Sequence, residues 1–494
     1  MASEYLYGAY GHLAESVAKS AMQTSTASVY FGTAPVNLVR EYKDSGGINV
    51  PIKVSNLPDA QRKLGYSADW ASFTLCEAMA AHFDNPIGNI GPVYMINVLD
   101  PDIHRKSADT TTSLNFVGGR SEIKSDAIIL DTLVLEDKME GVDFQIDYNF
   151  TRAVMVISSV NASEPITGTV LATYREVDAA MVDEQAIIGT NKPETGEYTG
   201  IGAVNLIYPK MNVIPNLLAA PGWSEFPAVY EELTAAAKKI NGHWDDMVAA
   251  DIPINDGTAV DTITKALTWK KQKGYSDENA KVCWPRVKDK QGRVFHLSTF
   301  AVVEFMRTDS NHSSVPMETC ANKPIPAMQQ YFGEDTTNKG FDQQTGNLLA
   351  QNGITTAVAW AGQWVLWGDH TAAYSFDTDM DPRVIFDVSM RMLYHITNSF
   401  QSEWANTIDR PMTRAVRDSI LNREQEKLDA LVGMGALIGD SRVLFLESEN
   451  PTSEMIEGRF RWDIPVTTAP PLKAASVYVA YTTEGFEGFF EEGE

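Results

Sequence analysis

The sequence of 494 residues predicts a multi-domain protein of the α+β class. Three observations predict this class. Apolar residues recur at every second position between about residues 100 and 190, strand and helix patterns alternate from 200 to 371, and two amphipathic helices open the last stretch, 386–494. We therefore expect an all-β insert, an α/β middle domain and a helical region that ends in a small sheet.

The N-terminal residues 1–25 are rich in alanine, serine, tyrosine and glycine and contain few large aliphatic side chains. A segment of this composition cannot form a core alone, so we interpret it as an arm that packs on another surface. Residues 26–100 then predict a strand at 26–31, a helix at 67–83 and a buried strand at 93–99.

Residues 101–195 have the two-residue period of an all-β insert. Glycine, asparagine and aspartate residues separate its four strand candidates, which are 126–135, 144–149, 153–158 and 167–175. A polar loop at 191–196 marks the end of this insert.

Residues 196–375 alternate between strand and helix patterns, which is typical of α/β layering. The predicted order is a strand at 213–220, a helix at 226–240, a strand at 247–252, a helix at 261–274, a strand at 281–286 and a helix at 298–307. We expect this α/β domain to form the middle of the protein.

Residues 376–482 begin with a helix at 386–404, whose apolar residues recur at helical spacing. A second helix is expected at 409–432, with Asp409 as its cap and Pro411 in its first turn. Three strand-like runs follow, at 442–449, 459–468 and 475–482. An acidic tail, 483–494, ends the chain.

The charge and the cysteines limit the function classes. The chain carries 65 acidic and 40 basic residues, a net charge of −25, which argues against wrapping nucleic acid or docking on an anionic membrane. Cys76, Cys283 and Cys320 are far apart, so we expect free thiols in a reducing compartment. No signal peptide and no apolar run long enough to span a bilayer is visible, so we expect synthesis in the cytoplasm and no membrane insertion.

Candidate chemistry is sparse. The eight histidines show no metal-ligand spacing, and the calcium-like run at 377–381 is followed by Pro382 where glycine is required. Trp360, Trp364 and Trp367 are able to bind sugar rings, but buried packing with a polar handle is the favoured interpretation. We therefore expect no catalytic residue, no metal and no cofactor, and we do not expect an enzyme.

Several short motifs, taken in order, resemble the contractile tail sheath proteins of myovirus phages and phage-derived contractile injection particles. They are FDN at 83–85 with VYMINV at 93–98, GVDFQIDY at 141–148, PNLLAAPG at 215–222, GIT at 353–355 with WGDHT at 367–371, GALIG at 435–439, ENPT at 449–452 and PP at 470–471. Each motif alone is a packing or turn signal, but their order covers nearly the whole chain.

The resemblance implies a discontinuous inner core domain, made from residues 26–100 and 376–482, with the β-rich insert outside it and extended arms at both ends. It implies a structural subunit that forms hexameric rings on a helical lattice around an inner tail tube and contracts to drive the tube through the host envelope. The expected partners are other copies, the tube protein, and baseplate and tail terminator proteins. The expected location is the virion tail, with assembly in the host cytoplasm.

The resemblance also assigns residues. Strand exchange between subunits would use Tyr5, Tyr7, Tyr10, Val477, Tyr478, Val479 and Tyr481. A tube-facing helix would present Arg410, Arg414 and Arg417, which a solvated helix face explains equally well. Two alternatives stay open: the sheath of a bacteriocin-like or other non-phage contractile particle, and, in a different class, a carbohydrate-binding virion protein.

Overall fold

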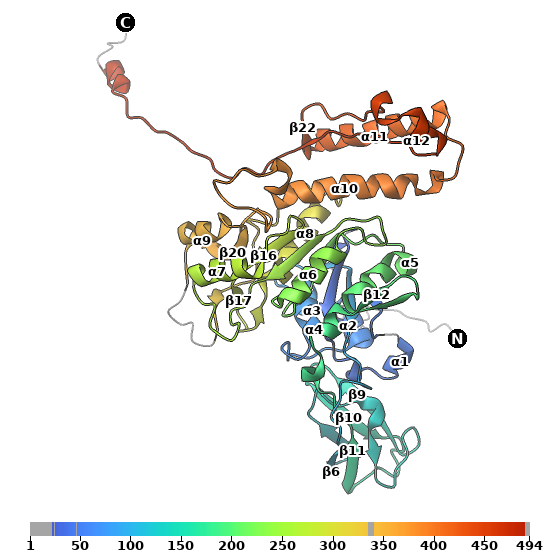
Figure 1. The fold of residues 1–494 in the computed structure, drawn as a ribbon. Helices are drawn as coiled ribbons and strands as arrows, with labels where there is room; N and C mark the ends of the chain where they lie inside the picture. The colour runs from blue at the N-terminus through green and yellow to red at the C-terminus, as the bar shows by residue number, and fades with distance from the viewer. Residues whose placement is uncertain (1–21, 24, 46, 334–339, 490–494) are drawn as a thin grey trace, which may run out of the picture.

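The computed structural model describes residues 22–23, 25–45, 47–333 and 340–489. A central body carries a β insert at one end and a helical layer at the other, and the C-terminal segment extends away from both (Figure 1). Within the described residues, no helix is both long enough and apolar enough to cross a membrane.

An eight-stranded sheet forms the body, and its inner strands are parallel. In spatial order the strands are β21 (Gln363–Trp367), β20 (Ile354–Trp360), β16 (Ala280–Cys283), β15 (Met247–Asp251), β14 (Leu217–Ala219), β2 (Ser28–Gly32), β5 (Val93–Asn97) and β3 (Pro51–Val54). Only the outermost strands, β21 and β3, pair antiparallel with their neighbours. Strands β2, β5, β14, β15 and β16 are buried at every position, as expected for strands covered on both faces.

Helices cover this sheet. They are α2 (Leu57–Leu64), α3 (Leu75–Phe83), α4 (Glu184–Ile188), α5 (Ile207–Met211), α6 (Pro227–Ala236), α7 (Ile263–Lys273), α8 (Leu297–Asn311) and α9 (Gln343–Ala350). One hydrophobic cluster extends from Ala27 to Ala372 and joins the helices to the sheet. Thr262 caps α7, and Gly274 ends it in the left-handed conformation, so the predicted bounds of this helix are nearly correct. A short helix α1 (Tyr42–Ser45) precedes the sheet's edge strand β3.

Smaller sheets flank the body. They are β1 (Met22–Gln23) with β4 (Ile90–Gly91), β12 (Thr190–Lys192) with β13 (Glu197–Thr199), and β17 (Arg286–Lys288) between β18 (Val294–Phe295) and β19 (Gln329–Tyr331). The chain therefore has a mixed α/β fold.

The expected core domain, residues 26–100 joined to residues 376–482, is wrong. Strand β2 pairs on one side with β14 and on the other with β5, so residues 26–100 share one sheet with residues 217–367. The physical reason is that β2 and β5 are wholly buried parallel strands, which need neighbours on both sides and helices on both faces. Residues 376–468 instead form a separate layer, whose hydrophobic cluster also includes Val315 and Met317 from the segment after α8.

The β insert consists of two three-stranded sheets that enclose a second hydrophobic cluster. One sheet has the order β6 (Thr110–Phe116), β11 (Gly168–Tyr174), β8 (Val134–Leu135), and the other β7 (Arg120–Ile123), β10 (Val154–Ser159), β9 (Phe144–Asn149). The strands predicted at 144–149, 153–158 and 167–175 are found within a residue. The strand predicted at 126–135 is mostly a turn, and β6 was missed because its run of threonine and serine shows little hydrophobic alternation.

The C-terminal layer contains α10 (Asp387–Trp404), α11 (Arg414–Met434) and α12 (Thr452–Ile456). Helix α10 has the predicted bounds. The strands predicted at 442–449 and 459–468 are wrong for most of their length: the only strand pairing here among the described residues joins β22 (Leu437–Ile438) to β23 (Thr467–Thr468), and one isolated bridge joins Leu444 to Asp463. The run predicted at 475–482 has no strand partner within the described residues. Alternating sequence alone does not make a strand where no neighbouring strand supplies hydrogen bonds.

Candidate assembly site at the C-terminal arm

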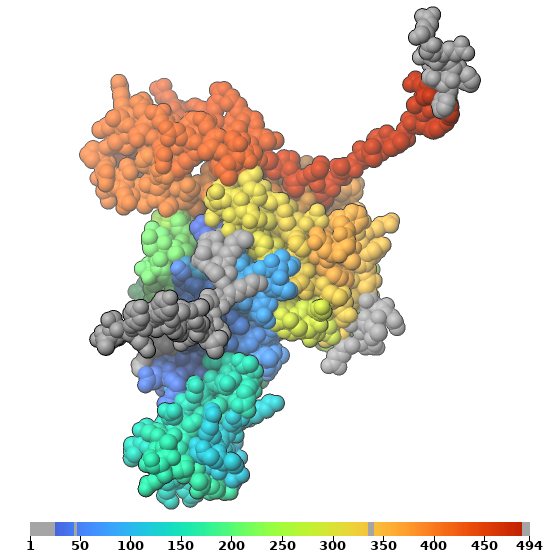
Figure 2. All heavy atoms as spheres, turned by 180° about the vertical axis from the view of Figure 1, so that it is seen from behind, coloured from blue at the N-terminus to red at the C-terminus, as the bar shows by residue number. Residues whose placement is uncertain are grey.

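The chain ends in an extended segment, residues 471–482, which we call the C-terminal arm. Figures 1 and 2 show it leaving the body and the helical layer without returning to either. Its apolar side chains are exposed: Val477 84%, Tyr478 95%, Val479 89% and Tyr481 81%. None of the arm's residues forms a strand pair within the described part of the chain. Such a row of β-prone side chains and free backbone groups is a template for pairing with another chain.

The sequence predicted Val477, Tyr478, Val479 and Tyr481 as strand-exchange residues, and the structure places all four on this exposed arm. Tyr5, Tyr7 and Tyr10 lie outside the described residues. The first element of the described residues, β1, pairs in parallel with β4 on the body.

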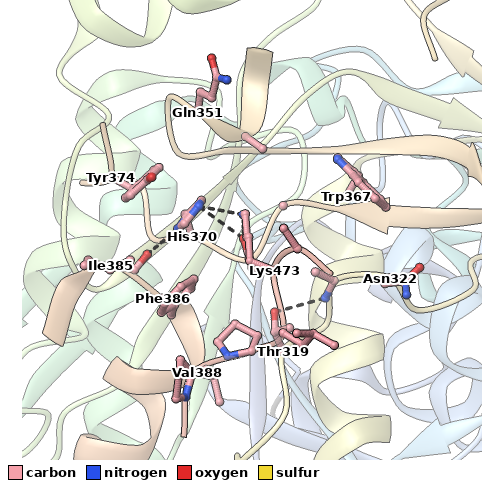
Figure 3. A pocket seen from close by; sticks show the side chains of 18 of the residues that line it. Thr319, Asn322, Gln351, Trp367, His370, Tyr374, Ile385, Phe386, Val388 and Lys473 are labelled. Carbon is pink, nitrogen blue, oxygen red and sulfur yellow. Dashed lines mark hydrogen bonds and ion pairs between the residues drawn. The ribbon is translucent and has the colours of Figure 1, made fainter. Parts of the chain in front are cut away.

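Lys473 fastens the root of the arm to the body. Its ammonium group contacts the Asp369 carboxylate and donates to His370 Nε2 at 2.8 Å (Figure 3). Because lysine has no acceptor, Nε2 must carry the lone pair, and His370 Nδ1–H donates to the Ile385 carbonyl at 2.8 Å. We call this set of contacts the arm latch.

The imidazole of His370 is held rigidly. It stacks on Tyr374 with ring centroids 3.5 Å apart and on Phe386 at 5.2 Å, as the close view shows (Figure 3). Burial lowers the pKa of His370 to about 4, and Lys473 acts in the same direction, against the opposing effect of Asp369. The imidazole is therefore neutral at pH 7 and able to accept the hydrogen bond from Lys473.

A cavity of about 1220 Å³ surrounds the arm latch. The arm root, the 369–380 loop and α9 line it, together with Trp360 and Trp367. These two indole rings lie 5.9 Å apart but are tilted by 56°, so they do not form one flat platform for a sugar ring. Trp367 Nε1 donates to Asn347, which fixes its orientation. Trp364 is half-buried and packs against the hydrophobic cluster of the body.

Helix α10 is attached to the body by buried ion pairs. Lys281 on β16 contacts Asp387 at 2.5 Å, and both side chains are 0% exposed. Burial lowers the pKa of Lys281, but the Asp387 carboxylate outweighs it, so the pKa is raised and the ammonium stays charged.

A second buried pair lies one turn further along α10. Arg391 makes two hydrogen bonds to Asp309 on α8, at 2.5 and 3.1 Å, and its guanidinium lies 4.2 Å from the Phe305 ring. Asn398 adds a hydrogen bond to the Asp245 carbonyl. These four charged residues were not predicted from sequence, although a lysine inside the otherwise apolar strand β16 was a visible signal.

The three arginines predicted on a tube-facing helix do not share one helix face. Helix α11 begins at Arg414, where the side chain of Thr413 accepts a hydrogen bond from Val416 N–H. Arg410 lies before the helix, since Asp409 has a positive φ of 66° and cannot act as the predicted cap. Arg414 is exposed, and Arg417 bonds to Asp418.

The described residues contain no group of three or more histidine, cysteine, aspartate or glutamate side chains that could hold a metal ion. Cys76, Cys283 and Cys320 are free and buried. Burial raises the pKa of Cys76 and of Cys320 to about 12, so these thiols stay protonated and unreactive. The exposed C-terminal arm is a surface suited to pairing with another chain, and such a surface is typical of proteins that self-associate.

Comparison with known proteins agrees with this class. No protein-family model matches the chain. It is 26% identical to the tail sheath protein of Burkholderia phage BcepMu over 98% of both proteins. Its fold is similar to a chain of the anti-feeding prophage baseplate (TM-score 0.56, 14% identity, 98% of this chain and 100% of that one) and to the sheath of the extracellular contractile injection system PVC in its contracted state (TM-score 0.54, 11% identity, 98% and 99%). The resemblance to contractile tail sheath proteins is thus confirmed.

Proposed function

We propose that this chain is the subunit of a contractile tail sheath, which polymerises as hexameric rings on a helical lattice around an inner tail tube. The observation that carries the proposal is the exposed C-terminal arm on a chain similar to tail sheath proteins over nearly its whole length. Contraction then drives the tube through the host envelope. As parts of this subunit we also propose an N-terminal arm at 1–25, a β-rich outer insert at 101–195 and an acidic tail at 483–494.

Strand addition suits such a subunit. The arm adds a strand to a neighbouring copy, and each backbone hydrogen bond contributes about 0.5–1.5 kcal/mol net. Contacts of this kind run head to tail, so they propagate along a lattice without closing into a dimer. The arm latch ties one end of the arm to its own body, and the exposed residues beyond it stay available for the neighbour.

Energy storage follows from the same arrangement. Strands that stay paired keep the copies connected while the bodies rotate and slide against one another. The extended lattice is kinetically trapped, and the contracted lattice has more body contact. The work comes from this difference summed over all copies, without nucleotide hydrolysis.

The partners of this proposal are other copies, the tube protein, and baseplate and tail terminator proteins, in the virion tail after assembly in the host cytoplasm. The similarity of the fold to a chain of the anti-feeding prophage baseplate supports the baseplate contact. A bacteriocin-like or other non-phage contractile particle is the alternative within the same class, since sheaths of injection systems share the fold. A carbohydrate-binding virion protein is the alternative from a different class.

Truncation of the arm tests the proposal. Deleting residues 471–494 removes the exposed arm but no part of the hydrophobic clusters, so we expect a folded monomer that forms no tubes. Negative-stain electron microscopy and sedimentation velocity measure this. The matched control deletes residues 483–494 and should still polymerise. Tubes from the longer deletion would contradict the proposed role of the arm, and glycan-array binding by a wild-type chain that forms no tubes would favour the carbohydrate-binding alternative.

We further propose that Arg414 and Arg417 at the start of α11 face an acidic tube, with Arg410 beside them. Reversing Arg414 and Arg417 to glutamate should abolish co-assembly with the tube protein in pull-down and electron micrographs. The control, Arg459→Glu, reverses an exposed arginine in a loop of the same layer, outside α11. Normal sheath around tubes in the double variant would refute the tube contact.

A further inference from the structure

Four charged side chains and one imidazole meet where the arm leaves the body. Lys281 pairs with Asp387 at 2.5 Å, and Lys473 at the arm root pairs with Asp369. The two pairs are neighbours, because the Asp387 N–H donates to the Asp369 carbonyl at 3.1 Å. With His370 neutral, two ammonium groups balance two carboxylates. We call these five residues the charge cluster.

Lys473 is the member of the charge cluster that can leave. It lies on the arm, and its side chain is 46% exposed, whereas that of Asp369 is 9% exposed and that of Lys281 is fully buried. When the arm root detaches, one ammonium group remains for two carboxylates. A buried carboxylate without a cation is costly, so the detached state needs a positive charge from another group.

His370 is placed to supply that charge. Its Nε2 lies 3.5 Å from the same Asp369 oxygen that Lys473 contacts, and 2.8 Å from the Lys473 ammonium group (Figure 3). The hydrogen bond from Nδ1–H to the Ile385 carbonyl keeps Nε2 turned toward Asp369. A proton added to Nε2 therefore lies beside the Asp369 carboxylate.

The rings around His370 suit an imidazolium as well as an imidazole. The planes of Tyr374 and Phe386 are tilted by only 7° and 17° from the plane of His370, so both rings present their faces to it. The face of an aromatic ring attracts a cation. The ring stack is therefore able to hold His370 in place after the imidazole becomes charged.

The seated lysine and a protonated imidazole exclude each other. A proton on Nε2 takes the lone pair that accepts from Lys473 and puts a second positive charge 2.8 Å from the ammonium group. Burial and Lys473 lower the pKa of His370 to about 4, against the opposing effect of Asp369. Detachment removes Lys473 and uncovers the cavity wall that the arm root forms, so both lowering effects weaken while that of Asp369 remains.

We propose that the arm latch is operated by a proton: when Lys473 leaves Asp369, His370 takes up a proton from solvent on Nε2 and replaces the lysine as the counter-ion of that carboxylate. Reseating the arm root expels the proton. The inference deepens the proposed function and rests on it for the role of the arm in joining copies. It adds that acid favours a detached arm root.

Other ionisable groups face the same cavity. Tyr374 stacks on His370, and burial raises the pKa of this tyrosine. Lys281 on β16 also lowers the pKa of His370, but it stays with Asp387 whether or not the arm is attached. The remaining charged residues of the cavity lining form one ion pair and two exposed carboxylates: Glu318 with Lys323, Asp377 and Asp379. Among the described residues of this lining, His370 is the side chain whose ordinary pKa lies near neutrality.

The direction of the pH effect follows from the number of bound protons. The detached state binds one proton more than the attached state between about pH 4 and the pKa of the detached histidine. Attachment of the arm root is therefore strongest above this window, and it weakens by about tenfold for each unit that the pH falls within it.

A histidine titration on the unassembled full chain tests the exchange. Lys473→Met removes the ammonium group and nearly keeps the length of the side chain, and the matched control Lys473→Arg keeps the charge. The nuclear magnetic resonance signal of the His370 ring is assigned by its loss in His370→Gln. From about pH 8 to about pH 5.5 we expect this signal to stay at its neutral position in the wild type and in Lys473→Arg, and to titrate in Lys473→Met. A Lys473→Met chain whose His370 stays neutral over this range would overturn the proposal.

The mobility of the arm root gives a second measure without changing the latch. The native cysteines are buried, so a nitroxide attaches to Ala475→Cys, close to the latch. As the pH falls from about 8 to about 5.5, we expect the ratio of mobile to immobile label in electron paramagnetic resonance spectra to rise by about tenfold or more. His370→Gln, whose amide oxygen accepts from Lys473 but does not titrate, should remove this dependence. Equal pH dependence with histidine and with glutamine at this position would contradict the exchange.

Both experiments use the unassembled chain, so they separate the proton exchange from the proposed function. Failure of these expectations in a chain that still forms tubes would overturn the exchange and leave the sheath function intact. A wild-type chain that forms no tubes, while His370 exchanges its proton as expected, would overturn the sheath function and leave the exchange standing.

Discussion

Helix α10 and the C-terminal arm are attached to the same body by different means. The pairs that hold α10 are buried, and Lys281 and Asp387 are both 0% exposed. The pair at the arm root is open on one side, because the side chain of Lys473 is 46% exposed while that of Asp369 is 9% exposed. Buried pairs fix an orientation strongly once formed, whereas exposed pairs contribute little. The difference predicts that the helical layer stays with the body and that the arm is released more easily.

The largest effect should come from breaking one buried pair. Lys281→Met leaves Asp387 buried without its cation, and we expect the free energy of unfolding to fall by about 3–5 kcal/mol. Urea denaturation followed by circular dichroism measures the loss. The double variant Lys281→Met with Asp387→Leu removes both charges and should recover most of the stability. A single variant as stable as the wild type would show that this pair does not hold α10.

A second prediction concerns the pH dependence of the body, through a buried cluster beneath α8. His296 Nδ1 lies 2.7 Å from Glu77, and Nε2 lies 3.4 Å from Glu225, which also pairs with Arg286 at 2.8 Å. Burial and Arg286 lower the pKa of His296, but Glu77 and Glu225 outweigh them and raise it to about 10. Burial raises the pKa of Glu225, but Arg286 and His296 lower it to about 2.

The direction of the pH effect follows from these values. The pKa of His296 is higher in the folded chain than the ordinary 6.5, so its stabilisation is complete below pH 6.5 and is lost as the pH rises toward 10. We expect the free energy of unfolding to fall by a few kcal/mol across this window. His296→Gln should flatten that slope, while His243→Gln, on an exposed loop, should not. An unchanged slope in His296→Gln would contradict the assignment.

Sequence patterns predicted a helix or strand well where the spacing of its own apolar residues determines which of its faces is buried. The bounds of α10 follow from its apolar spacing, and those of β9 from strict alternation. The patterns failed where the position of a strand depends on pairing with a segment distant in the sequence. The place of β2 in the middle of the body sheet depends on a partner that lies almost 200 residues away. The strands predicted between 442 and 468 lack neighbours to pair with.

The candidate site was predicted only in part, again because some of its contacts join residues that are distant in the sequence. The apolar run at 476–481 predicted a strand, and the resemblance to sheath proteins assigned that strand to an arm that pairs with another copy. The latch joins Lys473 to Asp369 and His370 across about a hundred residues, and no local pattern of sequence indicates such a contact.

The smallest effect is expected at the arm latch. Lys473→Ala removes a partly exposed ion pair, so global stability should change by at most about 1 kcal/mol. Amide hydrogen exchange at the arm root, residues 469–475, should nevertheless become faster, because Lys473 provides the hydrogen bonds to Asp369 and His370. Lys290→Ala, which truncates an exposed lysine on the body, is the control. A large loss of stability in Lys473→Ala would mean that the arm root is part of the fold, as α10 is, and the distinction between a fixed helix and a releasable arm would not hold.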